Sequence, residues 1–193
     1  MFGGGSSTNK GRLFIISGPS GVGKGTVISE LCKKDSQIVI SVSATTRQPR
    51  EGEVNGREYY FFSDEEFDKR VSEGAFLEWC AVHRNRYGTL LSEIDRIVTV
   101  GNHALLEIDV QGAMKVKQRV SDVVTIFIAP PSLEELRKRL ENRGTEREAD
   151  LLFRIDQAKN ELAAQQYYDY VVENHDVQEC VNAILSIMKK TKE

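Results

Sequence analysis

The stretch from Gly18 to Thr26 constrains this chain more than any other part of its sequence. It reads Gly-Pro-Ser-Gly-Val-Gly-Lys-Gly-Thr, follows the apolar run at 13–16 and leads into a helix-forming pattern at 27–31. Glycines let several backbone N–H groups turn toward one anion, and a helix start adds partial positive charge. Lys24 adds a full charge that can reach the terminal phosphates. An ordinary glycine turn is the simpler alternative, but this setting favours a loop that binds a nucleoside triphosphate. The predicted triphosphate-binding residues are Gly18, Pro19, Ser20, Gly21, Val22, Gly23, Lys24, Gly25 and Thr26.

The residue after the lysine departs from the usual form of this loop. That position normally carries Ser or Thr, whose hydroxyl touches Mg²⁺, whereas here it is Gly25, followed by Thr26. We therefore expect Mg²⁺ to be held mainly by phosphate oxygens and water, and we assign no protein residue as a metal ligand.

The composition and charge of the chain argue against several other classes of protein. With 193 residues, 28% of them charged and 40% hydrophobic, the chain suits one compact enzyme domain with small inserted parts. A net charge of -3 argues against a nonspecific nucleic-acid binder. Cys32, Cys80 and Cys180 are far apart, which argues against a disulfide framework or a zinc site and favours a reducing cytoplasm. The sequence has no apolar run of transmembrane length, so we expect no membrane association. Residues 1–10 have no hydrophobic signal core and are predicted to be a flexible tail.

The order of apolar runs predicts the fold class. Continuous apolar character, typical of parallel strands covered on both faces, occurs at 13–16, 38–42, 104–108, 123–129 and 170–172. Helical patterns lie at 26–34, 90–100, 133–140, 151–167 and 177–190. Alternating strands and helices predict a three-layer α/β fold around a parallel sheet.

Residues 43–89 break this alternation. They contain Pro49 and several glycines, with aromatic, β-prone pieces at 59–62 and 76–79. Ser63 and Glu66 form a capping box, a pattern that begins a short helix. We expect a small inserted subdomain with a mixed sheet and a function of its own.

Two arginines in this insertion indicate an anion site. Arg47 and Arg50 are three residues apart in a segment stiffened by proline, and Tyr59 and Tyr87 could add hydroxyl donors. Two guanidinium groups held close repel each other unless an anion lies between them, and they match phosphate oxygens in a forked geometry. A solvated arginine pair on a loop is the competing interpretation.

Three acidic residues sit in unusual places. Glu78 lies among large apolar residues, so it either faces water on an alternating strand or is buried against hydrogen-bond donors. Glu107 and Asp109 follow an apolar strand, at the sheet edge where parallel α/β folds bind ligands. Asp109 could instead cap a helix that begins at Val110.

The segment after Pro131 is rich in arginine and glutamate. A surface helix laced with ion pairs is the simplest interpretation of Arg137, Lys138 and Arg147. Arg143 differs because Gly144 follows it, and a mobile arginine at such a hinge can close over phosphates.

Taken together, these stretches resemble the guanylate kinases. The resemblance runs from about Arg12 to the C-terminus and is most specific at 18–26, 43–54, 76–79, 87–88, 108–112 and 143–145. It implies a P-loop kinase core at 11–42, 90–133 and 155–193, a GMP-binding subdomain at 43–89 and a short helical lid at 134–154.

The resemblance also implies roles for single residues. The GMP site would consist of Ser43, Arg47, Arg50, Tyr59, Glu78, Tyr87, Thr89 and Asp109. The catalytic residues would be Lys24, Arg139, Arg143 and Arg154. Asn174 lies in the segment where the family contacts adenine, Thr89 stands where the family often has serine, and Glu107 stands where many members have aspartate.

The implied reaction transfers the γ-phosphoryl group of ATP to GMP, within purine nucleotide metabolism. Two alternatives remain open. One is a kinase for another nucleoside monophosphate, and the other is a non-catalytic guanylate-kinase-like domain that binds phosphopeptides. The oligomeric state is not readable from the sequence, and a homo-oligomer stays open.

Overall fold

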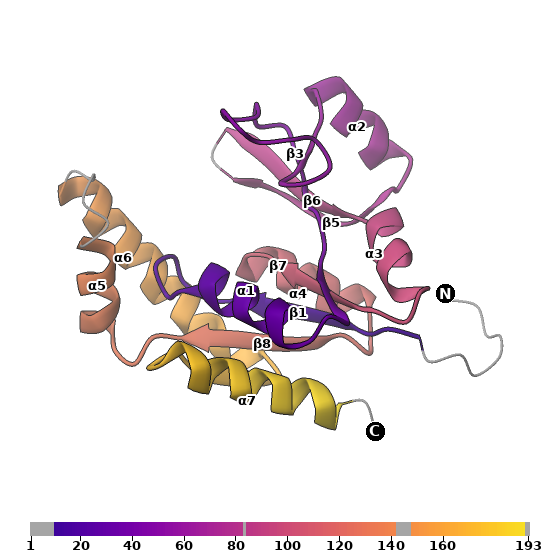
Figure 1. The fold of residues 1–193 in the computed structure, drawn as a ribbon. Coiled ribbons are helices and arrows are strands. Elements are labelled where there is room, and N and C mark those ends of the chain that lie inside the picture. Colours follow the sequence, from indigo (N-terminus) through magenta and orange to yellow (C-terminus); the bar gives the residue numbers. More distant parts are fainter. Residues whose placement is uncertain (1–9, 83, 142–147, 192–193) are drawn as a thin grey trace. The chain divides into compact units, whose positions relative to one another are not determined.

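The computed structural model describes residues 10–82, 84–141 and 148–191. It divides into two compact units, which we describe separately (Figure 1). The first unit contains Met1–Phe14, Gln37–Leu106 and Met114–Val123, and the second contains Ile15–Ser36, Glu107–Ala113 and Val124–Glu193.

The main sheet has five strands in the order β2-β7-β1-β8-β9. Its strands are β1 (Leu13–Ser17), β2 (Ile38–Ile40), β7 (His103–Glu107), β8 (Val124–Ala129) and β9 (Tyr170–Glu173). The β2–β7 and β8–β9 pairs are parallel, and every residue of β1 and β8 is buried. The apolar runs at 13–16 and 123–129 therefore became buried strands, as the sequence predicts. The prediction of burial is wrong for the runs at 38–42 and 170–172, because β2 and β9 are the edge strands of the sheet and only Ile38 and Val172 of these two strands are buried.

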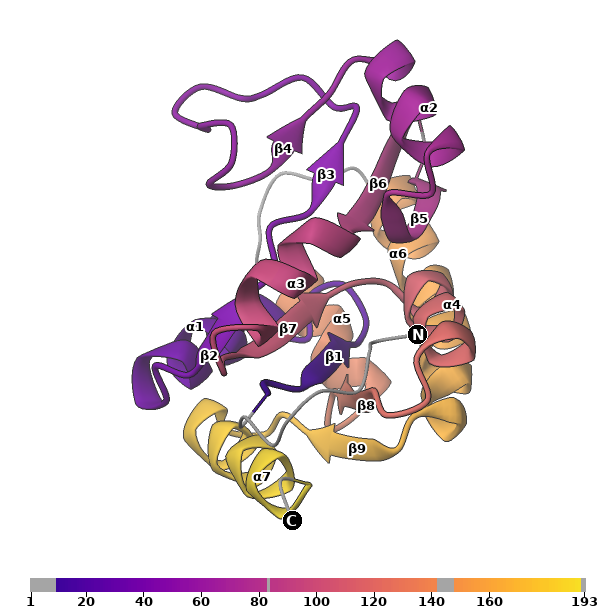
Figure 2. The ribbon, with the colours of Figure 1, turned by 90° about the vertical axis from the view of Figure 1, so that its right-hand side faces the viewer.

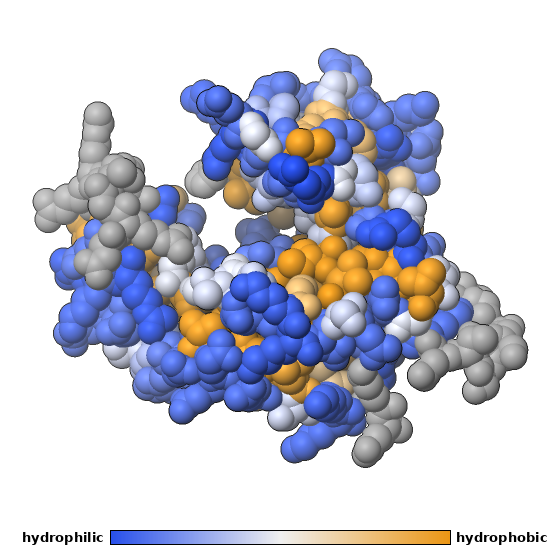
Figure 3. Space-filling view, viewed as in Figure 1, coloured by the Kyte–Doolittle hydropathy of each residue, from blue (hydrophilic) through white to orange (hydrophobic). Residues whose placement is uncertain are grey.

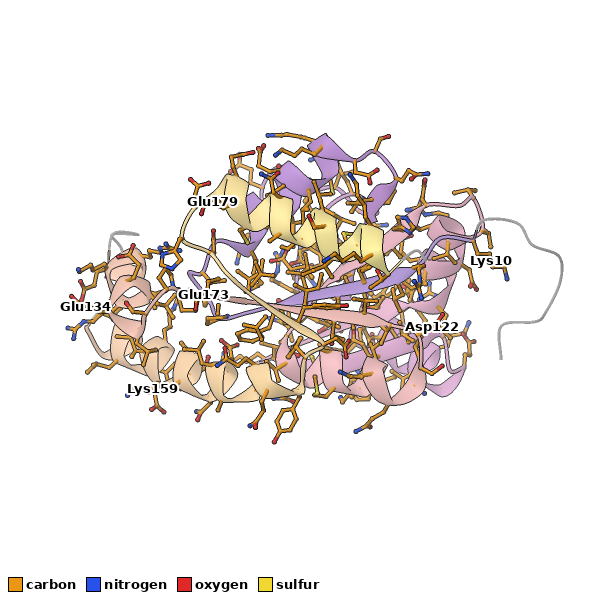
Figure 4. The ribbon with its side chains drawn as sticks, turned by 90° about the horizontal axis from the view of Figure 1, so that it is seen from below. Lys10, Asp122, Glu134, Lys159, Glu173 and Glu179 are labelled. Carbon is orange, nitrogen blue, oxygen red and sulfur yellow. The ribbon has the colours of Figure 1, made fainter. Side chains whose placement is uncertain are left out.

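Two long helices of the second unit lie on opposite faces of β8 and β9. Figure 4 shows α7 (Val177–Lys190) on one side and α6 (Glu148–Ala163) on the other, which gives three layers. The side chain of Asp176 caps α7 by accepting hydrogen bonds from Gln178 N at 2.7 Å and Glu179 N at 3.1 Å. Helix α1 (Lys24–Lys34) packs against α7, and α5 (Leu133–Glu141) packs against α6. A short 3₁₀ turn at Ala164–Tyr167 connects α6 to β9.

The first unit contains the predicted mixed sheet, with strand order β4-β3-β6-β5. Its strands are β3 (Ala44–Thr45), β4 (Tyr60–Phe61), β5 (Phe76–Val82) and β6 (Asn85–Leu90). Strand β3 is parallel to β4 and antiparallel to β6, and β5 is antiparallel to β6. Helix α2 (Asp64–Ser72) lies beside this sheet (Figure 2), and α3 (Leu91–Val98) follows β6 directly.

Helix α2 begins where the capping box predicts. The hydroxyl of Ser63 accepts a hydrogen bond from Glu66 N at 3.2 Å. Phe67, which is 0% exposed, points from α2 into a small core with Ala44, Phe76 and Leu90. The ring of Phe67 stacks on that of Phe76 with centroids 4.5 Å apart. This core includes residues of β5 and β6, the strands that carry Glu78, Tyr87 and Thr89 among the predicted GMP residues.

Helix α4 (Val110–Arg119) begins directly after Asp109. The Asp109 carboxylate accepts a hydrogen bond from Gly112 N at 2.7 Å, so the capping interpretation of this residue is confirmed. Among the described residues, no helix is long and apolar enough to cross a membrane.

We expect Phe67→Ala to lower the free energy of unfolding by about 3–5 kcal/mol, because it leaves a cavity in the core of the mixed sheet. Phe153→Ala is the matched control, since Phe153 is 55% exposed and its loss should cost roughly 1 kcal/mol or less. Urea unfolding followed by circular dichroism measures both, and equal losses would contradict the role of Phe67.

Candidate active site

The loop after β1 has a backbone that only glycine adopts readily at several positions. Gly18, Gly21 and Gly23 have φ angles of 153°, 85° and 98°. A Cβ atom on Gly18 would lie 2.3 Å from the carbonyl oxygen of Ile128, so no other residue fits there. Gly23 adopts a left-handed conformation just before α1, which begins at Lys24. The loop thus presents the N-terminus of a helix of eleven residues, as the sequence predicts.

Lys24 is folded back over this loop. Its ammonium group donates hydrogen bonds to the carbonyl oxygens of Gly18 at 2.6 Å and Pro19 at 3.3 Å. A Cβ atom on Gly25 would have no described neighbour within 4 Å, so steric crowding does not explain the missing hydroxyl there. Thr26 is exposed on the first turn of α1.

A cluster of polar residues that the sequence did not reveal, Glu161, Tyr168 and Ser17, lies next to the loop. Burial raises the pKa of Glu161 on α6, while the charge of Lys24 lowers it and that of Asp109 raises it. Burial raises the pKa of Tyr168 to about 12. The hydroxyl of Ser17, fully buried at the end of β1, donates to the carbonyl oxygen of Ile108 at 2.8 Å. Glu161 has no local sequence signal, because only the return of α6 brings it to Lys24.

Arg139 and Asn174 meet at the loop. Arg139, on α5, donates to the carbonyl oxygens of Val22 at 3.4 Å and Asn174 at 3.2 Å. The side-chain amide of Asn174, only 3% exposed, donates to Val22 at 2.7 Å. Asn174 therefore supports the loop from below, which is a structural role that the sequence alone did not indicate.

The other basic residues of the arginine-rich segment after Pro131 fall into two groups. Arg137 pairs with Glu141 at 2.7 Å and Lys138 with Glu134 at 3.1 Å, on the outer surface of α5, which is hydrophilic in Figure 3. The ion-paired surface helix predicted for Arg137 and Lys138 is thus confirmed. Arg154 is half-buried on α6, and Arg143 and Arg147 lie outside the described residues.

In the first unit, Arg47 is held in a fixed orientation by Glu53. Its guanidinium group donates to both carboxylate oxygens of Glu53, at 2.9 and 2.8 Å, and lies 5.3 Å from the centroid of the Tyr59 ring. Glu53 also accepts a hydrogen bond from the backbone N–H of Arg50 at 2.7 Å. Tyr59 and Tyr87 lie edge to face with centroids 6.0 Å apart. The structure thus brings Arg47 and both tyrosines together, whereas the Arg50 side chain is exposed.

Glu78 is buried and hydrogen-bonded. It is 4% exposed, and the hydroxyl of Thr89, 1% exposed, donates to its carboxylate at 2.8 Å. The two residues face each other across β5 and β6. The alternative in which Glu78 faces water is therefore wrong. A carboxylate has several acceptor positions, so a buried one is suited to reading hydrogen-bond donors of a ligand.

The other predicted GMP residues lie at the ends of strands. Ser43 is half-buried immediately before β3, and its backbone carbonyl accepts a hydrogen bond from Tyr60 N at 2.9 Å. Asp109 is half-buried after β7, whereas Glu107 at the end of β7 is exposed.

Glu93 on α3 is a second buried carboxylate of the first unit. It is 2% exposed and accepts hydrogen bonds from Val42 N at 3.1 Å, Tyr60 at 3.1 Å and the guanidinium of Arg96 at 2.8 Å. Burial acts to raise the pKa of Glu93, but the hydrogen bonds from Arg96 and Val42 outweigh it, so the pKa is lowered. This residue joins α3 to β4 and to the chain that enters β3. Its role depends on partners distant in the sequence, which is why sequence reasoning missed it.

The described residues contain no group of three or more His, Cys, Asp or Glu side chains that could hold a metal ion.

The Arg47–Glu53 pair makes a measurable pH prediction. The hydrogen bonds from Arg47 lower the pKa of Glu53 to about 2 from an ordinary 4.5. The pair therefore stabilises the fold above pH 4.5, and this stabilisation is lost as the pH falls toward 2. We expect Arg47→Met to move the pKa of Glu53 back toward 4.5, as followed by ¹³C NMR of the side-chain carboxyl. Glu58, whose pKa is lowered by Arg57, is the internal control and should not move. An unchanged Glu53 titration would contradict the pairing.

Comparison with known proteins gives a consistent result. The sequence profile of the guanylate kinase family matches residues 10–191. A guanylate kinase of Thermotoga maritima is 46% identical over 95% of this chain and 88% of its own length. One of Caldanaerobacter subterraneus is 48% identical over 95% of this chain and 89% of its own length.

Solved structures agree. The guanylate kinase of Anaplasma phagocytophilum matches with a TM-score of 0.76 and 35% identity, covering 96% of this chain and 88% of that one. The SH3-kinase fragment of tight junction protein 3 matches with a TM-score of 0.50 and 10% identity over 97% of this chain and 59% of that one, so it shares the fold alone. With a matching family profile over nearly its whole length and relatives at this identity, the chain belongs to the guanylate kinase family.

Proposed function

We propose that this chain transfers the γ-phosphoryl group of ATP to GMP, giving ADP and GDP, and that the residues described above carry the reaction. The observation that supports this most is the buried Glu78 carboxylate, fixed by Thr89 at 2.8 Å on the strand next to the Arg47 cluster.

Glu78 is suited to select guanine. Guanine presents N1–H and the 2-amino group as adjacent donors, and one carboxylate accepts both. Adenine presents a bare acceptor at the same edge, which would face the carboxylate lone pair to lone pair. Leaving a buried charge unmatched costs a few kcal/mol, so discrimination can exceed roughly a thousandfold. Ser43 would donate to the guanine O6, and Asp109 would support the site.

The GMP phosphate would bind at Arg47, Arg50, Tyr59 and Tyr87. Arg47 is already oriented by Glu53, which lowers the ordering cost when a phosphate arrives. Arg50 is exposed and would add its guanidinium only on binding. Both tyrosine hydroxyls would donate without adding charge.

The loop at 18–26 would hold the triphosphate of ATP through its backbone N–H groups and Lys24. The GMP phosphate is itself a nucleophilic anion at neutral pH, so the transfer needs no covalent intermediate. Catalysis then rests on position and charge neutralisation. Lys24 would stabilise charge on the β- and γ-phosphate oxygens, and Arg139, Arg143 and Arg154 would act on the charge that appears in the transition state.

The residues of the loop fit Mg²⁺ that arrives with ATP rather than a resident metal. Gly25 has no side chain, and Thr26 is exposed, so phosphate oxygens and water would form the inner shell. When bound, Mg²⁺ neutralises charge on the phosphates.

We also propose that the protein works in the cytoplasm, in purine nucleotide metabolism. The widely separated cysteines favour a reducing compartment, which supports the cytoplasm.

The two alternative functions fit this site less well. A kinase for AMP is disfavoured by Glu78, whereas dGMP presents the same base edge as GMP and remains a candidate substrate. A non-catalytic phosphopeptide-binding domain has little need for a complete phosphate loop, and here the loop glycines and Lys24 are all present. The direct test is phosphoryl transfer from MgATP to a panel of nucleoside monophosphates, with saturable use of GMP as the expected result. No saturable use of GMP would refute the proposal.

We expect Lys24→Ala to lower kcat by roughly several hundredfold while the protein stays folded, because a full charge at the reacting phosphates is lost. Lys138→Ala is the control, since Lys138 pairs with Glu134 on the outside of α5 and its loss should leave kcat near the wild-type value. Near-native turnover of Lys24→Ala in a coupled assay would show that the assigned role is wrong.

Glu78→Gln should mainly reduce kcat/KM for GMP, by about a hundredfold, because the amide accepts one hydrogen bond but has lost the charge. The KM for ATP should change little. An unchanged kcat/KM for GMP would count against Glu78 as the residue that reads the base.

A further inference from the structure

Strand β5, which carries Glu78, is an edge strand. In the order β4-β3-β6-β5 it pairs on one side only, with β6. Alternate carbonyl groups of an edge strand point away from its partner and need other donors. The register is irregular between Phe76 and Glu78, so the segment around Glu78 is also the least regular part of the ladder.

Two cations of α4 supply donors to this edge. Lys115 donates to the carbonyl oxygen of Trp79 at 2.6 Å. Arg119 donates to the carbonyl oxygen of Leu77 at 2.5 Å and approaches that of Phe76 at 3.3 Å. The carbonyls of Leu77 and Trp79 flank Glu78 on both sides.

The distance between Lys115 and Arg119 along α4 matches that between Leu77 and Trp79 along β5. Residues four apart on a helix are separated by about 6 Å along its axis. Residues two apart on a strand are separated by roughly 6.6 Å. Lys115 and Arg119 can therefore reach Leu77 and Trp79 together, from one side of one helix.

The hydrogen bonds from α4 to β5 come from charged side chains beside an open space. An open hollow of about 300 Å³ lies there, lined by Glu78, Trp79, Lys115, Gln118 and Arg119. The ammonium of Lys115 also lies 5.7 Å from the centroid of the Trp79 ring, within the range of a cation–π interaction. Charge-assisted hydrogen bonds to carbonyl groups are stronger than neutral ones, so two of them can hold a strand across such a hollow.

We propose that Lys115 and Arg119 are positioning residues for guanine recognition. They fix the backbone on both sides of Glu78, so that its carboxylate keeps both acceptor positions aligned with the two donors of guanine. Recognition of this kind tolerates displacements of only about 0.5 Å. The inference rests on the proposed role of Glu78 as the residue that reads the base.

The experiment compares GMP with inosine monophosphate, which lacks the 2-amino group and offers Glu78 one donor instead of two. The measured quantity is the ratio of kcat/KM for GMP to that for inosine monophosphate. We expect Arg119→Met and Lys115→Met each to lower this ratio about tenfold, because a displaced carboxylate loses the second hydrogen bond first. The KM for ATP should stay unchanged.

Conservative and control variants separate positioning from stability. Arg119→Lys and Lys115→Arg keep a cationic donor and should restore most of the wild-type ratio. Lys69→Met removes a lysine of α2 that lies 3.9 Å from Glu73 and whose side chain is 74% exposed, and it should leave the ratio unchanged. Thermal unfolding of each variant checks that it is folded. A general loss of stability would lower kcat/KM for both substrates equally and leave the ratio as in the wild type.

Glu78→Gln distinguishes the two possible failures. If Glu78→Gln lowers the ratio but both methionine variants keep the wild-type value, the positioning role is refuted and the base-reading role stands. If Glu78→Gln also keeps the wild-type ratio, Glu78 does not read the 2-amino group, and both proposals fail. If Arg119→Met does not fold, Lys115→Met decides the question by the same ratio.

Discussion

Three of the cations predicted to meet phosphate, Lys24, Arg139 and Arg47, are already bound to oxygen atoms of the protein. Lys24 donates to the carbonyl groups of its own loop and Arg47 to the carboxylate of Glu53. Arg139 donates to the carbonyl groups of Val22 and Asn174 and pairs with the carboxylate of Glu135 at 3.3 Å. A long cationic side chain loses about 2 kcal/mol of rotamer entropy when it is fixed. Here part of that cost is met before any nucleotide arrives.

The acceptors that hold these cations differ in charge. Carbonyl oxygens are neutral, so a phosphate can replace them without leaving a buried charge behind. Glu53 carries a full charge and competes directly for Arg47, but it is near the surface, where water can solvate it when the phosphate takes over. The arrangement therefore orients the cations without trapping them.

The sequence predicted the fold well where the signal is local. Continuous apolar runs marked β1 and β8, the pair Ser63 and Glu66 marked the start of α2, and the glycine pattern marked the loop at 18–26. The division into a core, an insertion at 43–89 and a lid at 134–154 stays a prediction. The missed residues act through partners distant in the chain. Glu161 reaches Lys24 only because α6 returns to the loop, and nothing near it in the sequence indicates this. The family resemblance assigns Asn174 to the segment near adenine, and its amide supports Val22.

Glu78 shows more clearly what the hydrophobic pattern of a strand cannot predict. Burial of a carboxylate on an apolar strand cannot be decided from the strand itself, because the deciding group, Thr89, lies on the neighbouring strand. The register of β5 and β6 settles the question, and that register depends on Gly88, where a Cβ atom would lie 2.8 Å from the carbonyl oxygen of Glu78.

The place of Trp79 has an experimental consequence. It is the single tryptophan of the sequence, it is 37% exposed, and it directly follows Glu78 on β5. Lys115 contacts both its ring face and its carbonyl group. Indole emission responds to nearby charge and to solvent, so the intrinsic fluorescence of this protein comes from one position beside the base-reading strand. The fold thus contains its own optical reporter there, and nucleotide titrations need no attached dye.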